Sequence, residues 1–146
     1  MNREIKFRGK SVKSGEWVYG CYCRIGGGIV CILPFDTGIV IDSRGQYVKR
    51  MDFIEVIPET VGEYTGLKDS KRTEEYPEGQ EIYKGDYVHI WSDFYKKDMP
   101  KAEVFWNNRN ARFDIKSPNG LYHDWLSNGH CQGWFIEVIG TIHDEE

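Results

Sequence analysis

The chain has 146 residues and a mass of 17.0 kDa, which suits one ordinary domain or two very small ones packed together. Its 14% aromatic content and 16 glycines favour strands and tight turns over helices, so we expect a mainly β fold. The net charge of −4 and the pI near 5.6 argue against a protein whose whole surface binds nucleic acid, although they are compatible with a local basic patch.

The compartment is inferred from two further patterns. No apolar run approaches the roughly 20 residues needed to span a bilayer, and Met1 to Lys6 lack the apolar stretch of a secretion signal. We therefore expect a soluble cytoplasmic protein without a membrane partner. The cysteines form no paired Cys-x-x-Cys motif, which favours reduced, mostly buried thiols. They are Cys21, Cys23, Cys31 and Cys131.

The first half of the chain indicates short strands in succession. Ile5 to Gly9 alternate apolar and basic residues, and the stretch Trp17 to Ile25 is the expected partner strand. Side chains alternate along a strand, so Cys21 and Cys23 share its more apolar face. Gly26 to Gly28 lack the spacing and the Lys-Ser/Thr pair of a phosphate-binding loop, and predict a hairpin turn instead.

Two short strands and an ambiguous segment follow. Ile29 to Leu33 and Ile39 to Ile41 are the expected strands, with a turn at Asp36, Thr37 and Gly38 between them. Lys49 to Ile57 suit either a final strand or a single helical turn. Pro58 ends this segment, because proline removes a backbone donor and restricts the residue before it.

Several segments spread over nearly the whole chain resemble one family, the YopX family of small phage and prophage proteins. The segments that carry the resemblance are Arg3 to Lys10, Gly15 to Gly20, Pro58 to Leu67, Glu81 to Val88 and Glu137 to Ile142. The chain differs from the family pattern between Asp69 and Gln80, where Ser70 to Gly79 form a longer loop than the usual tight turn.

The resemblance implies a protein encoded by a bacteriophage or prophage and made in the cytoplasm of the bacterial host. It implies a mainly β fold of two small units, the C-terminal one an SH3-like five-stranded barrel. We place an N-terminal hairpin and meander unit at residues 1–60, a connecting segment with the extended loop at 61–81, and the barrel at 82–146. The family has no established reaction, so the resemblance transfers no catalytic residues and no cofactor.

The second half of the chain has the pattern expected for the strands of a barrel. Val88 and Ile90 are expected to point one way, and Tyr87, His89 and Trp91 the other. The same alternation predicts which side chains of the later strands point inward, and turn-forming residues mark the ends of those strands. The expected inward residues are Ala102, Val104, Trp106, Phe113, Ile115, Trp134, Ile136, Val138 and Ile142, with turns at Asn107 to Asn110 and Ser117 to Gly120 and a helical turn at Asp124 to Gly129.

Two groups of residues suggest chemistry at first sight. Cys21, Cys23 and Cys31 could bind zinc with a histidine, but their spacing is not that of known zinc knuckles. Small core residues are the better interpretation. His130 beside Cys131 suggests a base and a nucleophile, yet catalytic partners are neighbours in space rather than in sequence. We expect no catalytic, cofactor-binding or metal-binding residues and no enzyme activity.

Binding is therefore the expected mode of action, through self-association or a host protein, because tyrosine and tryptophan are enriched at interface hot spots. The alternative is single-stranded nucleic acid, whose bases stack on aromatic rings and whose phosphates attract cations. The acidic total opposes this alternative. The candidate binding surface comprises Tyr87, Trp91, Phe94, Tyr95, Lys96, Lys97, Asn108, Arg109 and Arg112.

Overall fold

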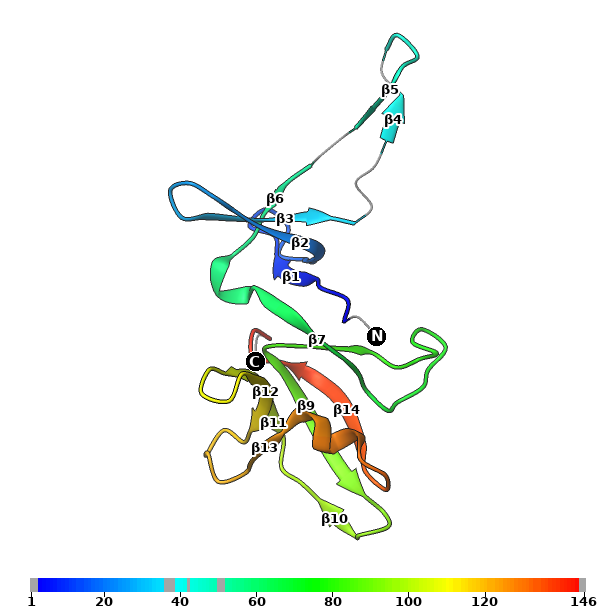
Figure 1. Ribbon diagram of the computed structural model, residues 1–146, viewed down its shortest axis with the longest axis vertical. Helices are drawn as coiled ribbons and strands as arrows, with labels where there is room; N and C mark the ends of the chain where they lie inside the picture. The colour runs from blue at the N-terminus through cyan, green and yellow to red at the C-terminus, as the bar shows by residue number, and fades with distance from the viewer. Residues whose placement is uncertain (1–2, 36–38, 42, 50–51, 145–146) are drawn as a thin grey trace. The chain divides into compact units, whose positions relative to one another are not determined.

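The computed structural model describes residues 3–35, 39–41, 43–49 and 52–144. The expected turn at Asp36, Thr37 and Gly38 lies outside the described residues. The chain is mainly β and divides into two compact units, Met1–Glu63 and Tyr64–Glu146 (Figure 1). Within the described ranges, no helix is both long and apolar enough to cross a membrane.

The first unit is built on an antiparallel sheet with the order β6-β3-β2-β1-β7. Two further strands, β4 and β5, pair only with each other among the described residues. The elements are β1 (Phe7–Lys10), β2 (Trp17–Ile25), β3 (Ile29–Pro34), β4 (Ile39–Ile41), β5 (Tyr47–Lys49), β6 (Ile54–Glu55), the 3-10 turn η1 (Pro58–Thr60) and the start of β7 (Gly62–Lys68).

The core of the first unit is small. Val30, Ile32 and Val56 are its buried residues, and Phe7 and Val18 pack against them. These side chains lie on one face of the sheet. Phe7 pairs with Gly20, which shares a face of β2 with Val18 because side chains two apart on a strand point the same way.

The more apolar face of β2 is therefore not the core face. Cys21 is exposed and Cys23 is partly exposed, whereas Cys31 on β3 is buried. Cys131, in the second unit, is also exposed. The prediction of mostly buried thiols is wrong for Cys21 and Cys131. Cys21 is exposed because the valine and isoleucine side chains on the other face of its sheet form the core, and Cys131 follows the end of η2.

Strand β7 belongs to both units. Its first residues, Gly62 and Glu63, pair with β1, and Tyr64 and Lys68 pair with β8. The segment 61–81, expected as a connection, thus contains the strand β7, which continues the first sheet through β1 to β8 and is not part of the sheet around β9.

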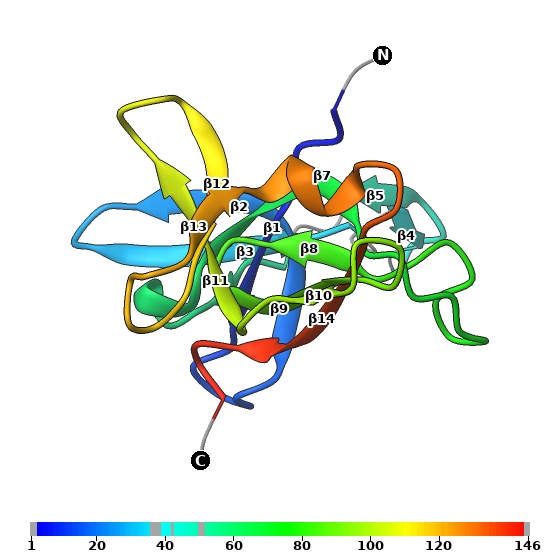
Figure 2. The same ribbon diagram turned by 90° about the horizontal axis from the view of Figure 1, so that it is seen from below.

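The second unit is a curved sheet organised around β9. Strand β14 pairs with one edge of β9, and β10 and β11 pair with the other, followed by β12 and β13 (Figures 1 and 2). The elements are β8 (Glu81–Tyr83), β9 (Asp86–Ser92), β10 (Lys97–Asp98), β11 (Ala102–Asn107), β12 (Arg112–Lys116), β13 (His123–Trp125), the 3-10 turn η2 (Leu126–His130) and β14 (Phe135–Thr141).

This sheet is a half-barrel. In the described part of the chain, β13 and β14 form no ladder with each other, so the sheet does not close in the way that a five-stranded barrel would. Its buried core is apolar, and its residues come from β8, β9, β11, β12, η2 and β14. The core residues are Ile82, Val88, Ile90, Ala102, Val104, Ile115, Leu126 and Ile136.

Two expected inward side chains are instead exposed. Trp106 is 40% exposed and contacts Phe113 edge-on at the end of β11. Ile142 is also 40% exposed, because the register of β14 on β9 shifts between Val138 and Gly140. A bulge of this kind reverses the alternation for the residues beyond it.

The long loop 70–79 is tied down at its base by Asp69, which is only 3% exposed. The Gln80 and Val138 amides donate hydrogen bonds to the two carboxylate oxygens of Asp69, at 2.8 and 3.0 Å. The Ser70 amide donates to the Ile136 carbonyl at 2.7 Å. The base of the loop is therefore fixed to β14.

Candidate binding surfaces

The outward face of β9 carries the first group of predicted surface residues. Val88 and Ile90 are buried, whereas Tyr87, His89 and Trp91 are half-buried on the other face, as the alternation predicts. Tyr87 is covered by the Lys101 ammonium, which lies 4.5 Å from the ring centroid.

Three rings form a ladder across β9 and β14. His89 and Trp91 stack with centroids 5.0 Å apart, because residues two apart on a strand share a face. Trp91 and Phe135 stack at 5.7 Å as direct cross-strand partners. Phe135 ends the ladder and is 43% exposed.

An open hollow of about 460 Å³ lies beside this ladder and is lined by Trp91, Lys96 and Lys97. Three carboxylates line it as well, from Asp93, Asp98 and Glu137. Asp98 accepts a hydrogen bond from His89, and Glu137 pairs with Lys71 at 2.8 Å. The lysines are therefore balanced by acids, and the hollow is not strongly cationic.

The loop between β9 and β10 is held by Ser92, which is 2% exposed. Its hydroxyl donates to the Gly133 carbonyl at 2.6 Å and accepts from the Tyr95 amide at 3.0 Å. Tyr95 stacks on Trp134 at 5.7 Å, and Phe94 projects outward with 77% of its surface exposed. The two aromatic residues of the loop therefore differ, one supporting a neighbour and one facing solvent.

The second group of predicted residues lies elsewhere. Asn108 and Arg109 occupy the turn between β11 and β12, and both are exposed. Strand β11 runs antiparallel to β9, so this turn is at the opposite end of the sheet from the loop that follows β9. The structure brings Trp91, Lys96 and Lys97 together but separates them from Asn108 and Arg109.

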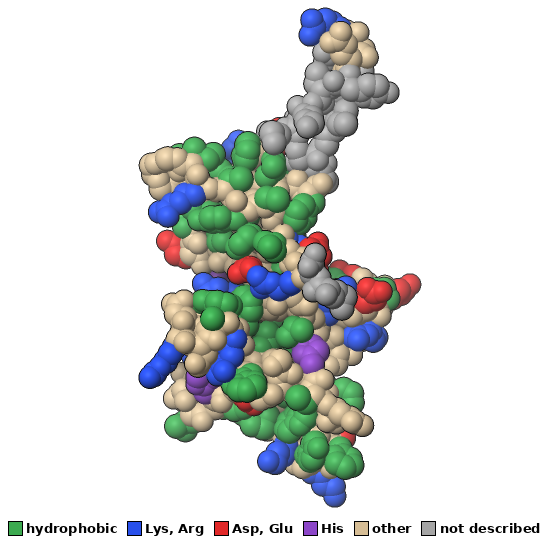
Figure 3. All heavy atoms as spheres, viewed as in Figure 1, with side chains coloured by type: hydrophobic (Ala, Val, Ile, Leu, Met, Phe, Trp, Pro, Cys, Tyr) green, Lys and Arg blue, Asp and Glu red, His purple; other side chains and the backbone are tan. Residues whose placement is uncertain are grey.

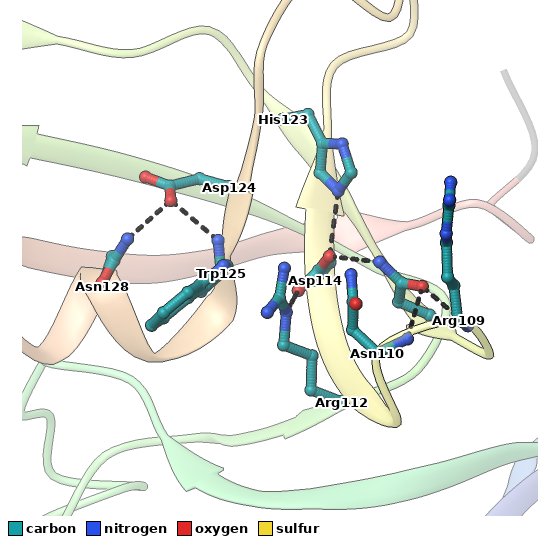
Figure 4. Close-up of polar contacts among 9 residues, drawn as sticks. Arg109, Asn110, Arg112, Asp114, His123, Asp124, Trp125 and Asn128 are labelled. Carbon is teal, nitrogen blue, oxygen red and sulfur yellow. Dashed lines mark hydrogen bonds and ion pairs between the residues drawn. The ribbon is translucent and has the colours of Figure 1, made fainter.

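Arg112 belongs to a polar cluster around Asp114, whose side chain is 0% exposed (Figure 4). Arg112 Nε donates to Asp114 at 2.7 Å, Asn107 donates at 2.8 Å, and His123 Nε2 lies 2.9 Å away. Burial alone would raise the pKa of Asp114, but these hydrogen bonds and the Arg112 charge hold that pKa below its ordinary value.

The Asp114 cluster was missed by sequence reasoning. Asp114 stands at an outward position of β12, between Phe113 and Ile115, and an outward acid normally indicates solvent. Its cover comes from a neighbouring strand, since Trp125 is its direct partner on β13 and lies under the Arg112 guanidinium at 4.5 Å.

A second cavity, of about 310 Å³, lies between η2, β13 and the inner side of β9. Ile90, Met99 and Trp134 supply its apolar walls, and Tyr122 and Asp124 contribute polar groups. Burial, and next the charge of Asp124, raise the pKa of Tyr122 to about 12. The phenol is therefore neutral at physiological pH.

The first unit presents an uncovered sheet face, which we call the open face. Tyr19, Ile25 and Ile29 are 44%, 46% and 43% exposed on it. Its members are Tyr19, Cys21, Cys23 and Ile25 of β2 and Ile29, Cys31 and Leu33 of β3, of which Cys31 is buried. Hydrophobic side chains are grouped over β2, β3 and β6 in the space-filling view (Figure 3).

The positions of the cysteines and histidines bear on the zinc and nucleophile interpretations. Cys23 and Cys31 are direct cross-strand partners. Within the described ranges, no group of three or more His, Cys, Asp or Glu side chains is arranged to hold a metal ion. His130 hydrogen-bonds the Lys68 carbonyl rather than Cys131.

Comparison with known proteins identifies the lineage. No curated protein and no solved structure shows significant similarity to the chain. The family described as YopX protein matches residues 6–146, which includes all the segments on which the resemblance rests except the first residues of the opening one. The chain therefore belongs to the YopX family.

Proposed function

We propose that this chain is a phage or prophage accessory protein of the bacterial cytoplasm that acts by binding rather than by catalysis. Membership of the YopX family supports the phage setting, because the resemblance implies it. We also propose that the half-barrel is the SH3-like module of that family. Self-association through the open face is the binding mode that the structure favours most.

The observation behind this proposal is the mismatch between core and surface in the first unit. Among the described residues its buried core cluster consists of Val30, Ile32 and Val56, while the opposite face of the same sheet exposes large apolar side chains. Contiguous exposed apolar patches on soluble proteins commonly mark interfaces. Covering this face would remove apolar surface from water on both partners.

A second copy of the chain is the partner that suits this face. In a two-fold contact the same patch meets itself, so charges on the patch would be brought against like charges. The side chains of β2 and β3 on the open face carry no charge, and the nearest charged residues on it are Arg8, opposite Tyr19, and Glu55, opposite Cys31. A two-fold contact centred on β2 and β3 would therefore bring mainly uncharged side chains together, and the exposed isoleucines and tyrosine supply the buried area.

Light scattering after size exclusion tests this proposal, in reducing buffer so that disulfides do not contribute. At about 100 µM chain, which populates a dimer of micromolar affinity, the mass should be about twice 17.0 kDa. Ile25→Lys should return it to the monomer. Leu121→Lys is the matched control, because Leu121 is 88% exposed but lies in the second unit. A monomeric wild type at this concentration would contradict self-association and leave a host protein as the partner.

Single-stranded nucleic acid remains the second candidate, favoured by Trp91, Lys96 and Lys97 around one hollow. Stacking on an aromatic ring contributes about 1–3 kcal/mol per base, so the ladder could hold a strand despite the acidic total. Two phosphate contacts predict a slope of about −1.4 for log K against log salt concentration.

Fluorescence anisotropy with a labelled oligonucleotide measures that slope. Lys96→Ala and Lys97→Ala should each weaken binding and lower the slope, whereas Arg109→Ala should change neither, because Arg109 lies at the opposite end of the sheet. Absence of binding at low salt would exclude this candidate.

A further inference from the structure

The cavity between η2, β13 and β9 differs from the hollow beside Trp91 in shape and charge. It is smaller, about 310 Å³, and its floor is apolar, formed by Ile90, Met99 and Trp134. Its polar groups come from Tyr122, Asp124 and Asn128 on the adjoining turn and strand. None of the side chains that line it is a lysine, arginine or histidine.

The Oδ2 atom of Asp124 is available as a hydrogen-bond acceptor. The Trp125 amide and the Asn128 side-chain amide both donate to its Oδ1 atom, at 2.8 and 2.5 Å (Figure 4). Among the described residues nothing donates to Oδ2 and no cation pairs with this carboxylate. The cavity therefore carries a fixed negative charge, oriented by η2, with one free oxygen.

The walls of the cavity are held in place by the fold. Trp134 is stacked on Tyr95, whose amide is bound by Ser92. At Gly129 a side chain would come within 3.0 Å of Ile90 and 3.1 Å of Ile136, so η2 packs directly onto the core. A ligand would thus meet a preformed site and lose little affinity to rearrangement.

We propose that this cavity binds an organic cation, an ammonium or guanidinium group on a short aliphatic stem, with Asp124 as its counter-ion. The stem would lie against Met99 and Ile90, and the indole of Trp134 would supply an aromatic wall, which favours cations. The neutral Tyr122 hydroxyl adds no competing charge. The volume is at the lower limit of ligand pockets, which suits a single side chain or a small amine better than a nucleotide.

The same chemistry has two possible sources, a free amine and a lysine or arginine side chain of a partner protein. Calorimetric titration separates them with agmatine as the free cation and the tripeptide acetyl-Gly-Arg-Gly-amide as the side chain in a peptide. Acetyl-Gly-Gln-Gly-amide is the neutral control. Binding of agmatine indicates a small-molecule site, and binding of the arginine peptide alone indicates a protein partner.

The decisive variant is Asp124→Asn, which keeps an acceptor for the Trp125 amide but removes the charge. Loss of an ion pair at a half-exposed site predicts up to about fivefold weaker binding of the cation. Glu75→Gln is the control, since it removes one negative charge from an exposed loop. Thermal melts of both variants establish that they are folded.

The proposal is overturned if neither cation binds at about 10 mM, a concentration that would detect even millimolar affinity. It is also overturned if Asp124→Asn binds the cations as well as the wild type does. The inference does not depend on self-association, because the cavity lies in the second unit and the open face in the first. The mass measurement and the titration can therefore fail separately.

Discussion

Replacing Asp114 by asparagine tests how much the buried carboxylate contributes to the second unit. Asp114 has no exposed surface and binds Arg112, Asn107 and His123 at 2.7–2.9 Å. Removing one partner of a fully buried ion pair costs about 3–5 kcal/mol. Arg112 and His123 are 35% and 51% exposed, so water can solvate them after the change. We therefore expect a loss of about 2–3 kcal/mol in the free energy of unfolding.

The pH dependence gives a second, independent readout. The pKa of Asp114 is lowered in the folded protein, so its stabilisation is fully present above the unfolded value of about 3.9 and is lost as pH falls through the folded pKa. The difference in unfolding free energy between the wild type and Asp114→Asn should therefore be largest at neutral pH. It should shrink below about pH 4.

Urea unfolding followed by tryptophan fluorescence measures both effects. Of the five tryptophans only Trp17 lies in the first unit, so the signal reports mainly on the second. Asp93→Asn, at an exposed position, should stay within about 0.5 kcal/mol of the wild type. If Asp114→Asn did the same, or if its effect were equal at pH 7 and about pH 3, the assigned role of the carboxylate would be refuted.

Three further substitutions or treatments have defined outcomes. A methyl group at Gly20 would lie 2.0 Å from a backbone oxygen of β3, so Gly20→Ala should lower stability by more than about 2 kcal/mol, whereas Gly26→Ala, with open space around it, should be nearly neutral in chemical denaturation. Burial, then the charges of its neighbours on β6 and β2, raises the pKa of the Cys31 thiol, so mass spectrometry after iodoacetamide treatment should show the exposed Cys21 and Cys131 alkylated first and Cys31 only in urea. Asp69→Ala leaves two backbone amides without acceptors and should cost about 2–4 kcal/mol, with faster hydrogen exchange at both; unchanged exchange would argue against the anchor.

The sequence predicts best where alternation acts on one strand at a time. Val88 and Ile90 share one face of β9 as expected, and Val104 on β11 is buried as expected, because an apolar residue at every second position marks one face of a strand. The ambiguous segment Lys49 to Ile57 contains the strand β6, and the 3-10 turn η1 comes after this segment, because Pro58 begins the turn.

The features that were missed depend on neighbours that a single strand does not reveal. Asp114 is buried because its cross-strand neighbours and Arg112 cover it. The sequence of a single strand does not determine its register with the next strand. Ile142 faces solvent because of the bulge before Gly140. On β2 both faces hold apolar residues, so the choice of core face depended on Val30 and Ile32 from the next strand.

The anchored base of the loop 70–79 makes its tip a convenient handle for experiments. Asp69 fixes the base, while residues 71–78 are exposed. Lengthening a loop whose ends are already fixed costs only about 0.6 kcal/mol per doubling of its length. An affinity tag inserted between Glu74 and Glu75 should therefore leave the fold intact. The tag would allow partners to be captured from the host bacterium without altering either the open face or the cavity lined by Asp124.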